Sequence, residues 1–157
     1  MKKLIIIIDD CKSWNTCLIE TCQSLGFETF PTMEDMKDDS FRRLSARICR
    51  HFSSSQEKIV KEAGEMIISS IQSAIEKQPS LEIEYLIDFE LYEGHPEVNG
   101  IAFYKKFAIN KKAIFISGTT DSGDINKIKN YCEENAQCIF ISKNNEDFIE
   151  QIKSAIT

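Results

Sequence analysis

The sequence lacks the ligand sets of the common zinc sites. Its two histidines, His51 and His95, are not at zinc-finger spacing, and none of its six cysteines forms a C-x-x-C pair. Cysteines scattered in this way are usually small buried residues of a protein from a reducing compartment, where disulfides are rare. We therefore expect neither a zinc site nor a disulfide framework, although Cys11 borders a pair of acids.

Basic charge is also in short supply. The chain has 25 acidic and 19 basic residues, which gives a formal net charge of −6. This balance argues against sequence-independent binding of nucleic acid, which requires a basic face. The arginines at positions 42, 43, 47 and 50 are predicted to form a solvated helix face, and His51 beside them is not expected to relay phosphate.

No apolar run is long enough to cross a membrane. The run after Met1 is too short for a secretory signal, because Asp9 and Asp10 end it and no small-residue cleavage site follows. No repeat, low-complexity tract or linker divides the 157 residues. The sequence therefore predicts one cytoplasmic domain over residues 1–157, long enough for a proper core and without an attached output domain.

Apolar segments alternate with amphipathic ones along most of the chain. Strands are predicted at residues 4–8, 27–30, 83–88, 113–117 and 138–143. Helices are predicted at 13–25, which Gly26 ends, at 101–109, at 125–135 with Asp124 as the cap, and at 145–156. This alternation predicts an α/β fold with a three-layer, doubly wound parallel sheet.

Residues 33–80 do not follow the alternation. Asp10 and Asp88 are 78 residues apart, whereas a path with two helices and one strand needs roughly 50. We therefore expect an inserted helical hairpin over approximately residues 33–80, before the third strand. Its apolar stripe, Ile59 to Ile75, either covers more of the sheet or pairs with a partner protein or a second copy, and we favour the pairing.

Polar side chains of related chemistry end the predicted core strands. Asp9 and Asp10 follow the first strand, Asp88 ends the third, Ser117 ends the fourth and Lys143 ends the fifth. The carboxyl ends of parallel strands form the site in sheets of this kind, so these groups are expected to gather there. Carboxylates suit a hard divalent cation, and an ammonium suits phosphate. We predict a cation held by the three acids, with Asp88 as a phosphoryl acceptor.

This arrangement resembles the receiver domain of two-component response regulators, over the whole chain except about residues 33–80. The resemblance implies a flavodoxin-like, five-stranded sheet with strand order 2-1-3-4-5. It also implies an Mg²⁺ site formed by Asp9, Asp10, Asp88 and the backbone carbonyl of Glu90. Asp88 would be the residue that accepts the phosphoryl group, and the phosphoprotein would take part in signal transduction through a phosphorelay.

The resemblance extends to further positions. Ser117 and Lys143 would contact the phosphoryl group, and Phe140, three residues before Lys143, matches an aromatic switch position that acts with Ser117. Asn99-Gly100 resembles the turn that opens the next helix. The implied partners are a histidine kinase or histidine phosphotransfer protein and a downstream protein, with a possible homodimer through the inserted helices and no nucleic acid or membrane. Catalysis would be limited to self-phosphorylation and self-dephosphorylation.

Some positions depart from the family pattern. Asn144 stands where a proline, often with a cis bond, usually follows the lysine, and a non-proline cis bond costs about 2.5–4 kcal/mol. The loop after Asp88 has Tyr92 in place of a proline and is several residues longer before Gly100, so that it could cover the site or slow dephosphorylation. These departures favour an alternative, a degenerate receiver that acts as an interaction module without being phosphorylated.

An enzyme is the third interpretation. Phosphohydrolases with an aspartate nucleophile after the first strand resemble D-x-D with a nearby threonine, whereas this chain has adjacent Asp9 and Asp10 followed by Cys11 and Lys12. The motif therefore disfavours this class.

Overall fold

The computed structural model describes residues 2–9, 11–37, 69, 72–73, 75–91 and 99–157. Within this part of the chain, five parallel strands form one sheet in the order β2-β1-β3-β4-β5. The strands are β1 (Lys3–Ile8), β2 (Glu28–Phe30), β3 (Glu82–Asp88), β4 (Lys112–Ser117) and β5 (Cys138–Ser142). The predicted fold class and strand order are confirmed.

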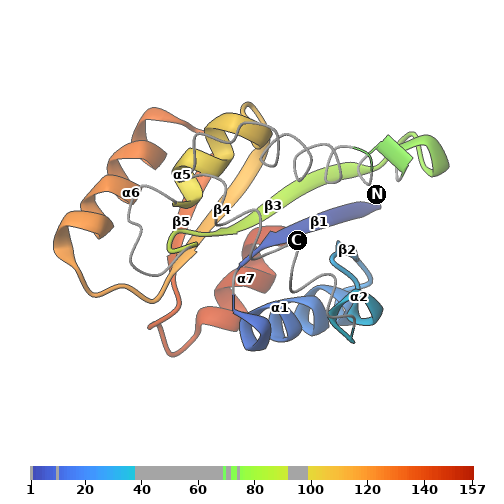
Figure 1. Cartoon of the computed structure of the whole chain (residues 1–157), viewed down its shortest axis with the longest axis horizontal. Coiled ribbons are helices and arrows are strands. Elements are labelled where there is room, and N and C mark those ends of the chain that lie inside the picture. The colour runs from blue at the N-terminus through green and yellow to red at the C-terminus, as the bar shows by residue number, and fades with distance from the viewer. Residues whose placement is uncertain (1, 10, 38–68, 70–71, 74, 92–98) are drawn as a thin grey trace.

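Helices cover both faces of the sheet. They are α1 (Lys12–Ser24), α2 (Met33–Lys37), α5 (Gly100–Phe103), the π-helical turn η1 (Tyr104–Ala108), α6 (Ser122–Glu134) and α7 (Phe148–Ile156). Figure 1 shows α1, α2 and α7 on one side of the sheet, and α5 and α6 on the other. The three layers expected from the alternating sequence pattern are therefore present.

The core has two halves because side chains alternate between the faces of a strand. In β1, Ile5 and Ile7 pack with residues of α1 and α7, whereas Leu4, Ile6 and Ile8 pack with residues of α5, η1 and α6. All five of these side chains are buried. A strand covered on both faces favours apolar residues at successive positions, which explains the continuous apolar run at residues 4–8 in β1.

Some element boundaries differ from the prediction. α6 begins at Ser122, and its cap is Asp121, whose carboxylate accepts a hydrogen bond of 2.9 Å from the Asp124 backbone N–H. The predicted cap at Asp124 was wrong because an earlier acid takes that role. α7 begins at Phe148 rather than at residue 145, and the predicted helix 101–109 becomes α5 followed by η1.

The end of α1 follows the prediction. Gly26 has a φ of +80°, and its N–H donates to the carbonyl of Gln23 at 2.9 Å. The next N–H, of Phe27, donates to the carbonyl of Cys22 at 3.1 Å. These two bonds form a Schellman motif, in which a glycine reverses the chain without steric cost. The chain is thereby turned directly into β2.

The short helix α2 was not predicted. It begins with a capping box, because the N–H of Thr32 donates to the Asp35 carboxylate at 2.8 Å and the N–H of Asp35 donates to the Thr32 hydroxyl at 3.1 Å. Thr32 and Asp35 are the sequence signal that could have revealed this helix. Met36 on α2 is buried against the half of the core that α1 covers.

The rest of the expected insertion is described only in part. Residues 69, 72–73 and 75–77 are helical, and Ile75, the end of the predicted apolar stripe, is 39% exposed. The first predicted helix and most of the stripe lie outside the described residues. The hairpin and its pairing surface therefore stay predictions.

In the part of the chain that the structure describes, no helix has the length and apolar character needed to cross a membrane.

A buried ion cluster lies at the amino ends of the strands. The Glu84 carboxylate, with a side chain that is 1% exposed, is 2.6 Å from the Lys3 ammonium and 2.8 Å from the Lys112 ammonium. Lys3 also donates to the backbone carbonyl of Ile156 at 2.5 Å, at the end of α7. This cluster joins β1, β3 and β4 to the last helix, far along the strands from the predicted site.

Replacing Glu84 by glutamine should therefore destabilise the fold. Removing one partner of a buried ion pair leaves the other charge uncompensated, so the free energy of unfolding should fall by about 3 kcal/mol in urea titrations. The control is Glu34→Gln, which breaks the exposed pair with Lys37 and should cost less than about 1 kcal/mol. Equal losses from the two variants would show that the buried cluster contributes no more than a surface pair.

Candidate functional site

Lys143 joins two of the predicted site acids. Its ammonium is 2.8 Å from the Asp9 carboxylate and 3.1 Å from the Asp88 carboxylate. Asp9 directly follows β1, and Asp88 ends β3, and these strands are paired in parallel with Ile8 opposite Ile87. The strand register therefore places the two acids side by side, and the lysine, which follows β5, reaches both.

The three charged groups are almost fully removed from solvent. The exposed fractions of the side chains are 0% for Asp9, 6% for Asp88 and 7% for Lys143. Burial raises the pKa of Asp9 above its ordinary value, because it penalises the carboxylate more than Lys143 and the Cys11 N–H favour it. For Lys143, burial acts to lower the pKa, but Asp9 and Asp88 together outweigh it and raise the pKa. The ammonium therefore stays charged between the two acids.

The turn after β1 fixes Asp9. One oxygen of its carboxylate accepts a hydrogen bond of 2.8 Å from the Cys11 backbone N–H, while the other faces Lys143. The buried side-chain amide of Asn15 donates to the backbone carbonyls of Asp9 and Cys11 at 2.6 and 3.0 Å. Asn15 lies in the first turn of α1, so the helix itself holds the turn that carries the acid.

The chain after β3 is packed closely against Asp88. The N–H of Phe89 donates to the carbonyl of Ile116 in β4 at 2.8 Å, and the N–H of Gly100 donates to the carbonyl of Phe89 at 2.9 Å. A Cβ at Gly100 would lie 2.5 Å from the Asp88 carbonyl oxygen. Position 100 requires glycine because the start of α5 approaches the end of β3 this closely.

The loops after β4 and β5 are tied to each other. The N–H of Lys143 donates to the Ser117 carbonyl at 2.8 Å, and the side-chain amide of Asn144 donates to the Gly118 carbonyl at 2.9 Å. The Lys143–Asn144 peptide bond is trans, since the cis bond among the described residues is Phe30–Pro31. Asn144, which stands where the family usually has proline, therefore links the lysine to the serine loop by a hydrogen bond.

Ser117 is buried at the end of β4, beside the strand that carries Asp88. Its hydroxyl accepts a hydrogen bond of 3.0 Å from the backbone N–H of Thr119.

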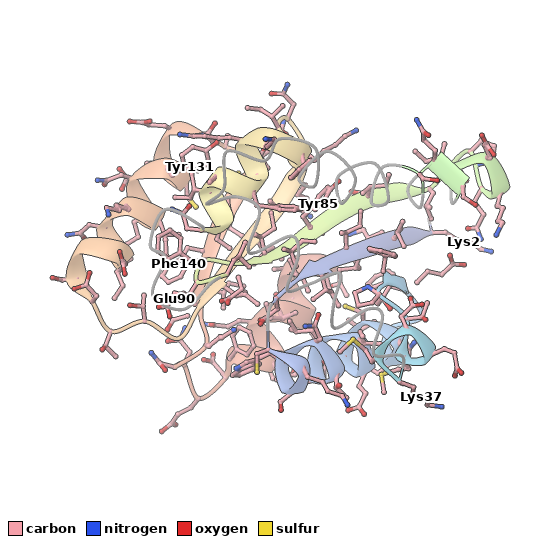
Figure 2. The ribbon with its side chains drawn as sticks, viewed as in Figure 1. Lys2, Lys37, Tyr85, Glu90, Tyr131 and Phe140 are labelled. Atoms are coloured by element: carbon pink, nitrogen blue, oxygen red, sulfur yellow. The ribbon has the colours of Figure 1, made fainter. Side chains whose placement is uncertain are left out.

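Phe140 is half-buried in β5 opposite Phe115, on the sheet face covered by α5 and α6. Glu90 is exposed just past the end of β3 and forms a bridge with Asn99, and Figure 2 labels both Glu90 and Phe140.

The oxygen donors fit a hard cation in chemical type. Asp9 and Asp88 supply two buried carboxylates, and carboxylate oxygen is what Mg²⁺ prefers. Within the described residues, no group of three acidic, histidine or cysteine side chains is arranged to hold a metal ion. Asp10, the predicted third acid, lies outside those residues. The metal site therefore stays a prediction.

Three contributors were not foreseen from the sequence. Trp14 places its ring 4.8 Å from the Lys143 ammonium, Asn15 holds the turn of Asp9, and Asn144 links the two loops. In the sequence, Trp14 and Asn15 look like ordinary helix residues, and Asn144 is visible only as a departure from the proline usual in receiver domains. A weak signal exists for Trp14 and Asn15, because both fall in the first helical turn after the acidic pair.

Comparison with known proteins supports the fold. The chain is similar to the crystal structure of a response regulator receiver protein from Burkholderia phymatum. The two have 14% sequence identity and a TM-score of 0.52, and the similarity covers 99% of this chain and 95% of that chain. No family model and no curated protein matches the sequence. The chain has the receiver-domain fold, which confirms at this level the resemblance drawn from the strand-end residues.

Substituting Gly100 by alanine should disturb the end of β3. The added Cβ would press on the Asp88 carbonyl and on Ile87 at 2.9 Å, so the free energy of unfolding should fall by about 1–3 kcal/mol. Gly118→Ala is the matched control, because the nearest atom to its Cβ is 4.0 Å away. Denaturant titrations in which both variants are as stable as the native protein would contradict the close approach.

Asp9→Asn should gain stability relative to the native protein as pH rises above 3.8 when EDTA is present. As pH rises above the ordinary value of 3.8, the unfolded chain ionises this residue while the folded chain, with its raised pKa, still holds the proton. The native state therefore loses stability between 3.8 and the raised pKa, and asparagine avoids this loss. Urea titrations over this range should show the advantage of the variant shrinking as pH falls. A stability difference between the variant and the native protein that does not change over this range would contradict the raised pKa of Asp9.

Proposed function

We propose that this protein is a response-regulator receiver that accepts a phosphoryl group on Asp88 in a two-component phosphorelay. The observation that carries the proposal is the contact of the Lys143 ammonium with both Asp9 and Asp88 at the carboxyl ends of adjacent strands. The similarity to a receiver fold supports the proposal. The proposal rests on the site as well as the fold, because a fold alone does not define a function.

In the proposed reaction an oxygen of the Asp88 carboxylate attacks the phosphorus of a phosphorylated histidine. The new O–P bond forms as the P–N bond breaks, and the electron pair of that bond returns to the histidine nitrogen of the donor. Such transfers depend mainly on positioning and on neutralisation of charge. Lys143 is placed to neutralise phosphoryl oxygens, and Ser117 would donate its hydroxyl to one of them.

Mg²⁺ is the proposed cofactor. Asp9, Asp10, Asp88 and the backbone carbonyl of Glu90 would hold it, and when bound it would neutralise the acids and draw in the phosphoryl oxygens. Lys143 already compensates part of the negative charge of Asp9 and Asp88. The Lys143 ammonium would therefore place a positive charge beside the incoming phosphoryl group.

Phosphorylation would be transmitted through β4 and β5. Ser117 would move toward the phosphoryl group and Phe140 would turn inward behind it, which alters the surface formed by these strands and their neighbouring helices. The proposed partners are a histidine kinase or phosphotransfer protein and a downstream protein in the cytoplasm. The protein would thus be a phosphoryl acceptor that signals by contact rather than an enzyme with a separate substrate.

The alternative of a degenerate receiver makes a different prediction for a phosphoryl mimic. An active receiver should bind beryllofluoride in the presence of Mg²⁺, whereas an unphosphorylated interaction module should not.

The hydrogen bond of Asn144 to Gly118 offers a substitute for the usual proline in holding the loop that carries Lys143. This contact favours the active receiver.

The deciding experiment is phosphorylation with acetyl phosphate and Mg²⁺, followed by intact-protein mass spectrometry. The native protein should gain the mass of one phosphoryl group, and Asp88→Asn should gain none because its amide cannot form an acyl phosphate. Omission of Mg²⁺ should also abolish the gain. Modification of Asp88→Asn to the native extent would exclude Asp88 as the acceptor. Turnover of a generic phosphate ester by that variant would instead point to a phosphohydrolase.

A further inference from the structure

The Lys143 ammonium has an aromatic neighbour as well as two acids. The ring of Trp14, the single tryptophan of the chain, lies with its centroid 4.8 Å from the nitrogen. A cation over an indole ring is attracted by the negative charge of its face, and more strongly when water is excluded. The Lys143 side chain is 7% exposed, so this contact is made largely out of water.

A long, flexible side chain such as that of Lys143 needs contacts along its path to hold its ammonium in one position. Its ammonium is a compact charge on a flexible stem, and here the stem follows β5 and reaches past β4 to the acids of β1 and β3. Two of the three N–H donors can serve Asp9 and Asp88. The indole ring covers a further side of the ammonium and limits where it can move.

Trp14 is itself held in place from two directions. It lies in the first turn of α1, next to Asn15, whose amide fixes the turn of Asp9. Its ring meets the ring of Phe148, the first residue of α7, edge to face with centroids 5.3 Å apart. The indole of α1 is therefore held by α7 in the position where it contacts Lys143.

We propose that Trp14 is a positioning residue that holds the Lys143 ammonium where an incoming phosphoryl group would meet it. The proposal rests on the proposed function for its consequence, since it assigns Trp14 to the same site. Without the indole face the ammonium has more freedom, and a bound phosphoryl mimic gains less from it. Trp14 contacts neither the phosphoryl group nor the Mg²⁺ ion in this role.

The first test does not depend on phosphoryl chemistry. In EDTA, the emission spectrum of the single tryptophan should change on Lys143→Met, because a charge next to the indole is removed. Lys127→Met, which changes a lysine with a 72% exposed side chain on the opposite face of the sheet, should leave the spectrum unchanged. Identical spectra for the native protein and Lys143→Met would overturn the contact.

The second test measures affinity for beryllofluoride by calorimetry with Mg²⁺ present. Trp14→Leu should weaken binding about tenfold, and Trp14→Phe, which keeps an aromatic face, should recover much of the loss. Phe27→Leu is the matched control, because it removes an aromatic ring from Lys3 at the amino end of β1, and it should leave the affinity unchanged. In a Lys143→Met background, Trp14→Leu should have no further effect.

Three outcomes of the second test would overturn the proposal. They are native affinity in Trp14→Leu, no recovery in Trp14→Phe, and a full additional loss in the Lys143→Met background. Unfolding titrations identify a variant that fails to fold, and Trp14→Phe then serves as the reporting variant. If the native protein binds no beryllofluoride, the proposed function and the consequence for binding fail together. The emission spectra still decide separately whether Trp14 holds Lys143.

Discussion

One ammonium group compensates the charge of two carboxylates that the strand register places side by side. The parallel pairing of β1 and β3 brings Asp9 and Asp88 side by side at the carboxyl ends of these strands, where both are buried. Like charges repel there, and burial penalises both carboxylates. Lys143 offsets this cost from the other end of the sequence. The loops after β1, β4 and β5 are held by hydrogen bonds that preserve this arrangement.

The sequence was most informative where one structural role dictates the residue type. Strands covered on both faces are mostly apolar, so β1, β3 and β4 were predicted within a residue of their observed bounds. Gly26 was predictable because the reversal of the chain after α1 requires a glycine. The strand-end groups were predictable because a charged site in a parallel sheet lies at the carboxyl ends of its strands. The placement of Asp9, Asp88 and Lys143 together follows from the parallel topology alone.

Features that depend on competing local choices were less predictable. Asp121 and Asp124 are both plausible caps for α6, and only the backbone path decides that Asp121 is used. The roles of Trp14 and Asn144 depend on contacts across the sheet that no local spacing encodes. Asp10 and most of the expected insertion lie outside the described residues, so the metal site and the pairing surface stay predictions.

The bond between Lys3 and the Ile156 carbonyl has a consequence for how the chain folds. It joins residues 153 positions apart and brings the first strand, an interior strand of the sheet, against the last helix. Closing so long a segment costs entropy before any contact repays it, and folding slows as contacts become more distant in sequence. The native contacts of the first strand are therefore complete only when the last helix of the chain has docked.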